Sequence, residues 1–140
     1  MTHQKYSVGF LFNDDQVVLI RKNRPEWQAG KYNGVGGHVE VGETFEQCME
    51  REFEEETGVR VTGWTQFLIM DFPEAEIAFF TKYDPEATYE VKTMTDERVR
   101  RIEVYDLDLY GVIDNLKWIV PFAQQSHKYD RVVLKSRGDA

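Results

Sequence analysis

The chain has 140 residues, of which 41% are hydrophobic and 14% are aromatic, a composition typical of a folded globular protein rather than a disordered one. Acidic residues outnumber basic ones by 25 to 17, and the net charge of −8 disfavours binding to a nucleic-acid polymer, which usually requires a basic surface. A single cysteine excludes a disulfide within the chain, and no segment approaches the ~20 apolar residues of a membrane span, so we expect a cytoplasmic protein without a membrane partner.

The first quarter of the chain predicts a β-hairpin followed by a loop. Val8–Phe12 and Val17–Lys22 are rich in β-branched and aromatic residues and flank a polar turn. Asn23–Asn33 is polar and contains proline and glycine, which is typical of a loop that ends in an Asn-Gly turn. Val35–Val41 is expected to form a short strand that leads into a helix.

Thr44–Thr57 is the first predicted helix. Thr44 has the side chain of an N-cap, and Gln47 three residues later completes a capping box. Gly58 follows the last turn and suits a left-handed C-terminal cap. At about 100° per residue, the apolar side chains share one sector, which we expect to face the core: Phe45, Cys48, Met49 and Phe53.

Three glutamates of this helix are expected to point inward. Glu52 and Glu56 fall inside the apolar sector, and Glu55 lies at its edge. Glu50 and Glu54, in contrast, fall on the opposite face, where solvated charges belong. Carboxylates spaced at i, i+3 and i+4 repel one another by a few tenths of a kcal/mol per pair, and burial adds to that cost. Such a cluster usually persists because it binds a cation, and oxygen ligands of this kind suit Mg2+.

The second half of the chain predicts further strands and a second helix. Trp64–Phe72 and Glu76–Tyr83 are expected to be strands, and Asp84–Asp96 an irregular polar stretch. Arg100–Asp106 alternates charged with apolar residues and also predicts a strand. Leu116–Gln125 predicts a helix whose internal proline should interrupt its hydrogen bonding. Strands mixed with two helices indicate a layered domain of the α/β or α+β class.

The segment Gly37–Val59 resembles the Nudix box, G-x5-E-x7-R-E-U-x-E-E-x-G-U, in which U is a bulky apolar residue. Every fixed position is filled at the required spacing by Gly37, Glu43, Arg51, Glu52, Phe53, Glu55, Glu56, Gly58 and Val59. Phe53 is larger than the aliphatic residue usual there, and the flanks Tyr32–Gly36 and Asn115–Ala123 are also similar to the family. The resemblance implies one Nudix hydrolase domain over residues 1–140, folded as an α/β/α sandwich with a mixed β-sheet.

The Nudix resemblance implies metal-dependent hydrolysis of a pyrophosphate bond in a nucleoside diphosphate linked to another group. A nucleoside triphosphate, standard or damaged, is the first candidate substrate, and ADP-ribose or a nucleotide sugar is the main alternative. A module that senses a nucleotide without cleaving it is a second function, and hydrolysis of an RNA cap or 5′ end is a third, which the charge of −8 disfavours. The expected partner is a small nucleotide. Homodimers are common in the family, although the sequence gives no basis for predicting the oligomeric state.

Mg2+ or Mn2+ is the expected cofactor, bound by the three inward glutamates, Glu52, Glu55 and Glu56. The resemblance adds the main-chain carbonyl of Gly37 as a ligand. Glu52 is favoured as general base or ligand, two roles that the sequence does not separate. Arg51 can pair with a glutamate four residues later on the helix, and Glu43 is expected to orient Arg51 or the loop rather than to bind metal.

Residues outside the motif supply further candidates. Many Nudix enzymes recruit an additional acid, for which Glu97 and Glu103 are candidates, with a surface charge as the competing interpretation of each. Candidate substrate contacts are basic side chains for phosphate, an amide for a base edge and aromatic rings for stacking: Arg21, Lys22, Arg24, Asn33, Trp27, Tyr32 and Trp118. Ordinary packing is the competing interpretation of each ring, and an exposed hairpin end that of the basic residues.

Overall fold

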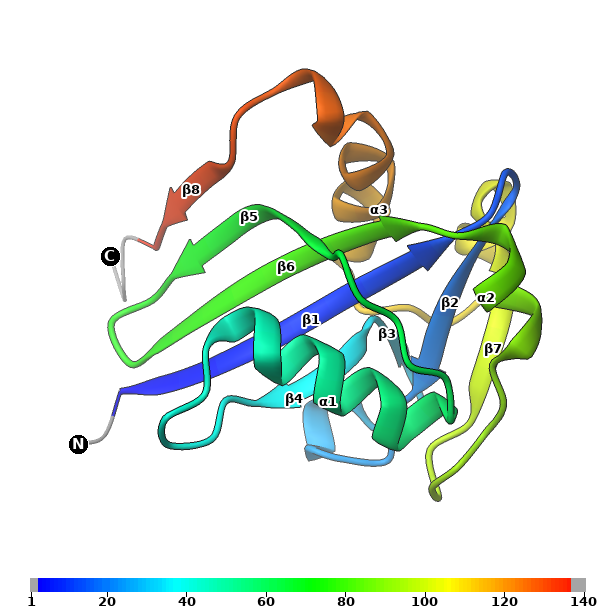
Figure 1. Ribbon diagram of the computed structural model, residues 1–140, viewed down its shortest axis with the longest axis horizontal. Coiled ribbons are helices and arrows are strands. Elements are labelled where there is room, and N and C mark those ends of the chain that lie inside the picture. Colours follow the sequence, from blue (N-terminus) through cyan, green and yellow to red (C-terminus); the bar gives the residue numbers. More distant parts are fainter. Residues whose placement is uncertain (1–2, 137–140) are drawn as a thin grey trace.

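A computed structural model describes residues 3–136 as a mixed eight-stranded sheet with helices (Figure 1). The strands are β1 (Gln4–Phe12), β2 (Gln16–Arg21), β3 (Tyr32–Asn33), β4 (Val35–His38), β5 (Thr65–Asp71), β6 (Ala75–Tyr83), β7 (Val99–Glu103) and β8 (Val132–Lys135). The α-helices are α1 (Phe45–Thr57), α2 (Pro85–Glu90) and α3 (Leu116–Gln125), and the 3-10 helices are η1 (Glu26–Gln28), η2 (Val104–Leu109) and η3 (Ser126–Lys128). The mixed sheet with its helices confirms the predicted fold class.

The sheet divides next to β1, and this division positions the motif. Its main strand order is β3-β2-β1-β6-β5-β8, with β4 added to β1 and β7 added to β2. β1 runs parallel to β6 along its whole length. On its other side β1 pairs with β4 near its start, where Ser7 is opposite Gly37, and with β2 only at its end, where Leu11 is opposite Val18. Because β1 and β2 diverge, β3 pairs with β2 while the next strand, β4, pairs with β1.

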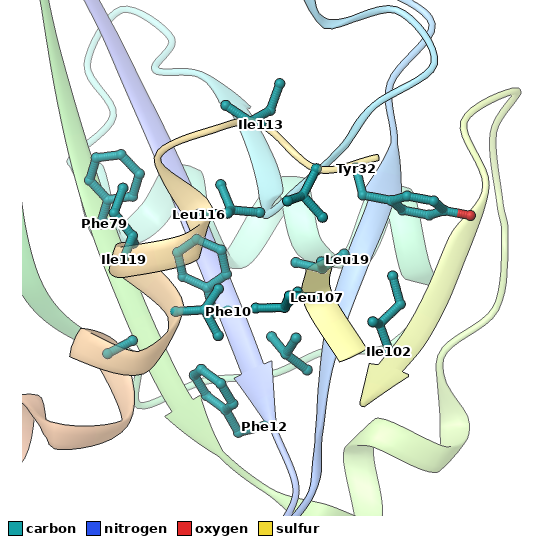
Figure 2. Packing of buried hydrophobic residues seen from close by; sticks show 14 of the residues in the cluster. Phe10, Phe12, Leu19, Tyr32, Phe79, Ile102, Leu107, Ile113, Leu116 and Ile119 are labelled. Carbon is teal, nitrogen blue, oxygen red and sulfur yellow. The ribbon is translucent and has the colours of Figure 1, made fainter. Parts of the chain in front are cut away.

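Alternate residues of the central strands pack into two cores on opposite faces of the sheet. Phe10 and Leu19 belong to the core that is closed by α3, which contributes Ile119 (Figure 2). Leu11 belongs to the other core, which is closed by Met49 and Phe53 of α1. This alternation is the period of two expected of strands, and it produces the α/β/α layering that the sequence predicts.

Helix α1 has the ends and the apolar face that the sequence predicts. The Thr44 side chain accepts a hydrogen bond from the Gln47 N–H, and the Gln47 side chain accepts one from the Thr44 N–H, so both halves of the capping box are formed. Gly58 ends the helix with a left-handed φ of 78°. The helix lies so close to β1 that a Cβ on Gly9 would meet the Met49 sulfur at 2.6 Å. This close packing fixes α1 rigidly above the sheet.

The structure differs from the predicted elements in several places. The predicted loop Asn23–Asn33 contains η1 and the short strand β3, and β1 begins at Gln4 rather than at Val8.

The stretch Asp84–Asp96 contains α2, whose N-cap Asp84 accepts a hydrogen bond from Ala87. An aspartate followed by proline at the first helical position is a helix-start signal that could have revealed it. The predicted strand from Arg100 ends at Glu103, η2 follows it, and β8 was not predicted. The remaining predicted strands and α3 are confirmed with shifts at their ends. In the described part of the chain, no helix is both long and apolar enough to cross a membrane.

Candidate active site

Strand β4 and helix α1 bring the two ends of the motif together. Gly37 lies on β4, directly against the side chain of Glu52 on α1. A Cβ placed on Gly37 would lie 2.6 Å from the Glu52 carboxylate, so only glycine leaves room for this approach. The strand backbone and the carboxylate therefore share one small space.

Arg51 links the loop, the strand and the helix through a single guanidinium group. Its Nε and Nη2 bind the two oxygens of Glu43 at 2.7 and 3.0 Å, which is a bidentate pair. Its Nη1 lies 2.9 Å from Glu52 Oε1 and 3.3 Å from Glu55 Oε2, and Nη2 donates to the His38 carbonyl at 3.0 Å. The guanidinium holds the pKa of Glu43 below its usual range, and the carboxylates raise the pKa of Arg51. Arg51 is thus an ordered bridge rather than a surface charge.

The carboxylates of Glu52 and Glu56 are partly buried. Burial raises the pKa of Glu52, against the opposing effect of Arg51. Burial, with the charge of Glu52 as the second cause, raises the pKa of Glu56 to about 8. Glu56 Oε2 is buried and, among residues 3–136, has no hydrogen-bond partner. The positive charge of Lys22, which pairs with Glu97, and a hydrogen bond with the Gly36 backbone lower the pKa of Glu56 only in part.

The structure separates the two candidate acids outside the motif. Glu97 is only 4% exposed, and its charge acts on Glu56. Its oxygens accept hydrogen bonds from Lys22 Nζ at 3.0 Å and from the backbone N–H of Asn23 at 2.7 Å. Glu103 is exposed at the other end of β7, where it accepts a hydrogen bond from a glutamine of β2. Only Glu97 is brought to the inward glutamates, and the contact from Asn23 had no signal in the sequence.

The acids of the site fit a divalent cation by their donor chemistry rather than by a cluster that is already formed. In residues 3–136, no three His, Cys, Asp or Glu side chains are already gathered as a metal site, and Arg51 joins Glu52 to Glu55 instead. The donors nevertheless fit a hard cation. Glu56 has an unbonded buried oxygen, and carboxylate oxygens are the ligands that Mg2+ prefers. The carbonyl of Gly37 lies on the adjacent strand, and Cys48 Sγ is within 3.6 Å of its oxygen.

Cys48 is a packed thiol, as its place in the apolar sector predicts. It is fully buried, and Sγ lies 3.3 Å from the His38 carbonyl oxygen. Burial raises the pKa of this thiol to about 11, so it stays protonated near neutral pH. The thiol thus packs the start of α1 against β4 rather than acting as a nucleophile.

The candidate phosphate-binding residues differ in whether their charge is paired with an acidic side chain. Lys22 pairs with Glu97, and Arg24 pairs with Asp96. Arg21 is exposed, and its Nε donates to the Gly30 carbonyl at 3.4 Å. The competing interpretation, an exposed hairpin end, thus describes Arg21 better than it describes Lys22.

The candidate base-binding residues also divide into two groups. Asn33 uses its amide locally, donating to Gln28 and accepting from the Gly34 N–H. Tyr32 is 8% exposed and packs in the core with its ring edge against Tyr110. Trp27 and Trp118 are 64% and 44% exposed. Packing therefore accounts for Tyr32, whereas the two tryptophans leave part of their rings open to solvent.

Comparisons with known proteins identify relatives of this chain. The NUDIX domain family model matches residues 2–125. The NAD-capped RNA hydrolase NudC of Vibrio cholerae is 36% identical over 115 residues, which cover 75% of this chain and 39% of that protein. The oxidized purine nucleoside triphosphate hydrolase of Danio rerio is 48% identical over 44 residues, which cover 31% of this chain and 28% of that protein. The chain thus spans less than half the length of these curated relatives.

A solved structure of an ADP-ribose pyrophosphatase from Streptococcus suis superposes with a TM-score of 0.73. It covers 95% of this chain and 99% of that one at 15% identity, a level at which the likeness concerns the fold alone. The family match, in contrast, extends over most of the sequence and includes the complete motif on β4 and α1. The chain belongs to the Nudix hydrolase family.

Proposed function

We propose that this protein hydrolyses a pyrophosphate bond in a nucleoside diphosphate linked to another group, with Mg2+ or Mn2+ as cofactor. The observation that carries the proposal is the Glu56 carboxylate, which is buried with one unbonded oxygen beside the charges of Glu52 and Glu97. Such an arrangement is costly for the protein alone and becomes favourable when a cation joins it.

The chain's own residues can be given roles. Glu52, Glu55 and Glu56 would hold the metal with the Gly37 carbonyl, and Glu97 is the favoured additional acid. The metal would supply positive charge to the phosphate oxygens. The oxygen of a water attacks one phosphorus, the P–O bond of the anhydride breaks, and the leaving phosphate departs with the bridging oxygen.

A carboxylate must accept the proton that the water loses. Glu52 is the favoured base, because it lies against the backbone of Gly37 and burial raises its pKa. Arg51 holds Glu52 and Glu43 in place through hydrogen bonds of 2.9 Å or less. Arg51 is therefore a positioning residue rather than a catalytic one.

The first candidate substrate is a nucleoside triphosphate, standard or oxidised, in line with the name of the zebrafish relative. The second is a dinucleotide pyrophosphate such as NAD at the end of an RNA, favoured by the name of the Vibrio cholerae relative. ADP-ribose and nucleotide sugars contain the same type of bond. Binding without cleavage remains the competing function.

A panel of nucleoside triphosphates, dinucleotides, ADP-ribose and nucleotide sugars, incubated with Mg2+ and analysed by chromatography, tests the proposal. We expect Glu56→Gln to lower kcat/KM by at least about 100-fold, because a metal ligand matters more than the residues that support it. Glu54→Gln on the solvated face is the matched control and should keep wild-type turnover. No turnover of any substrate, or equal turnover by Glu56→Gln, would refute the proposal.

Three further properties belong to the proposal. We infer a single domain over residues 1–140 and a cytoplasmic location, and a homodimer is a candidate assembly because homodimers are common in the family. Light scattering on the purified protein measures the oligomeric state, and limited proteolysis tests whether one resistant domain spans the chain.

A further inference from the structure

Three arginines lie together on one face of the sheet, and we call them the arginine surface: Arg21, Arg98 and Arg100. Arg100 on β7 is directly opposite Leu19 on β2, and the Arg21 N–H donates to the Arg98 carbonyl at 2.8 Å one step further along the same pair of strands. Residues two apart on a strand point to the same face. Because Leu19 packs in the core beneath α3, all three arginines lie on the α3 face.

The positive charge of this surface is not neutralised within the protein. All three side chains are exposed, and none of them forms a salt bridge within residues 3–136, although the chain has 25 acidic residues. The nearby Arg24, in contrast, pairs with Asp96. Like charges opposite each other on neighbouring strands are destabilising. The surface therefore carries an electrostatic cost that an external anion would relieve.

Aromatic rings lie among these arginines. The Arg100 guanidinium sits 5.0 Å from the centre of the Tyr110 ring, and Tyr110 in turn packs against Tyr32. Figure 2 shows the Tyr32 side chain extending from the core toward β7 with its hydroxyl outermost. A guanidinium stacked on a ring, with further cations beside it, is the combination with which proteins bind single-stranded nucleic acid.

The arginine surface adjoins the proposed active site along the chain. Arg21 directly precedes Lys22, and Arg98 directly follows Glu97, so the Lys22–Glu97 ion pair lies between the arginines and the glutamate helix. Lys22 and Glu97 act on Glu56 electrostatically, while the arginines face the other side of the sheet. A ligand that passes from one face of the sheet to the other at the end of β2 would contact both the arginine surface and the glutamates of α1.

We propose that the arginine surface binds the phosphate backbone of a single-stranded polynucleotide whose terminal nucleotide occupies the active site. The inference rests on the proposed function for the position of that terminal nucleotide. The net charge of −8 argues against a protein that is basic throughout, yet three unpaired arginines are a local exception to it. A phosphodiester chain fits better than an acidic peptide, because a base can also stack on the exposed Arg100 guanidinium, which lies over the Tyr110 ring.

Fluorescence anisotropy with a labelled single-stranded RNA of about ten nucleotides, in EDTA so that nothing is cleaved, tests the proposal. We expect the double variant Arg98→Glu/Arg100→Glu to bind at least about 10-fold more weakly, with a salt slope that is shallower by about 0.7 for each phosphate that the variant no longer neutralises. Arg60→Glu is the matched control, since Arg60 is also exposed and, in the described residues, also lacks an ion pair. It should bind RNA within about twofold of the wild type.

A charge-conserving variant, Arg98→Lys/Arg100→Lys, guards against misfolding, because it retains the electrostatic attraction while losing the planar stacking. We expect it to retain most of the affinity. Equal RNA binding by the wild type and the glutamate double variant would overturn the proposal, as would an equal loss in Arg60→Glu. Binding of poly-glutamate instead of RNA would also overturn it.

Hydrolysis of free nucleotide, measured on the same samples with Mg2+, separates this inference from the proposed function. Loss of RNA binding in the double variant supports the arginine surface even if the wild type hydrolyses nothing, whereas the proposed function fails in that case. Intact hydrolysis with unaltered RNA binding leaves the proposed function standing and refutes the arginine surface.

Discussion

The inward glutamates of α1 and the arginine surface of β2 and β7 are both clusters of like charge, but the protein treats them differently. Glu52 and Glu56 are partly buried, whereas Glu55, which was also expected to point inward, is exposed. Arg51 pairs with Glu52 and Glu55, and the pKa of Glu56 is raised to about 8. The arginines are exposed and, in residues 3–136, have no acidic partner. One cluster is thus built to receive a desolvated cation, and the other presents its charge to an anion from solution.

The two clusters depend on their surroundings to different degrees. A buried carboxylate without a partner costs the protein several kcal/mol, so the glutamates need their supporting bridge and their cation. Exposed guanidinium groups are screened by water and salt, so the arginines need no support to persist. Mutations should therefore have large effects at the first cluster and small effects on stability at the second.

Removal of the bridge should produce the largest effect. Arg51→Ala leaves the carboxylates of Glu43 and Glu52 without their cation, and we expect the free energy of unfolding to fall by about 3 kcal/mol. We expect nucleotide hydrolysis to fall by about 100-fold, because Glu52 loses its orientation. Urea denaturation and steady-state kinetics measure the two effects, with Arg60→Ala as the control. Wild-type stability in Arg51→Ala would show that the bridge is dispensable.

The next largest effect is expected when the glutamate cluster is crowded by an added methyl group. Gly37→Ala places a methyl group where the Glu52 carboxylate lies, 2.6 Å away, so the carboxylate must shift. We expect the Mg2+-dependent kcat/KM to fall by about 10-fold or more. Gly111→Ala is the matched control, because the nearest heavy atom to its Cβ would be 4.0 Å away. An equal effect of both substitutions would argue against a site at Gly37.

Glu56 should make the stability of the metal-free protein fall as pH rises. Its folded-state pKa of about 8 lies above the ordinary value of 4.5, so the folded state keeps the proton longer than the unfolded state does. Stability is therefore full below the unfolded pKa and is lost as pH rises toward about 8. Relative to Glu56→Gln, we expect the wild type in EDTA to lose about 3 kcal/mol between pH 5 and pH 8. Parallel urea curves for the two proteins at every pH would contradict this cause.

The smallest effect is expected at the arginine surface. Arg98→Gln removes one of two like charges that lie opposite each other, so we expect the free energy of unfolding at low salt to rise by about 0.3 kcal/mol. The gain should vanish at about 0.5 M NaCl, where the charges are screened. Arg60→Gln, measured in the same denaturation series, should show no such salt-dependent gain. A loss of stability in Arg98→Gln at low salt would indicate an unrecognised partner of this arginine.

The glutamate helix could be read from the sequence because its information is local. The caps follow from residue types at the two ends of α1, and the apolar sector and the partly buried Glu52 and Glu56 follow from a period of 3.6 residues. Glu55, at the edge of the sector, is exposed. The arginine surface could not be read in this way. It joins Arg21 to Arg98 and Arg100, nearly 80 residues later, and only the register between β2 and β7 brings them together.

The difference between local and non-local information also explains why other predictions about the site were only partly correct. Arg51 has the predicted helical neighbour, Glu55, at 3.3 Å, but its strongest partner is Glu43 in the loop, through a bidentate contact that helical spacing does not predict. Glu97 and Glu103 look alike as charges near a strand, and only the fold separates the buried acid from the exposed one. The strand β8 was missed because its pairing with β5 is also non-local.

Calorimetric titration of Mn2+ into the metal-free protein measures whether the inward glutamates bind a divalent metal. We expect saturable binding by the wild type, binding at least about 10-fold weaker by Glu56→Gln, and wild-type binding by Glu54→Gln on the opposite face of the same helix. Equal Mn2+ affinity in the wild type and Glu56→Gln, with both proteins folded, would show that Glu56 is not a metal ligand.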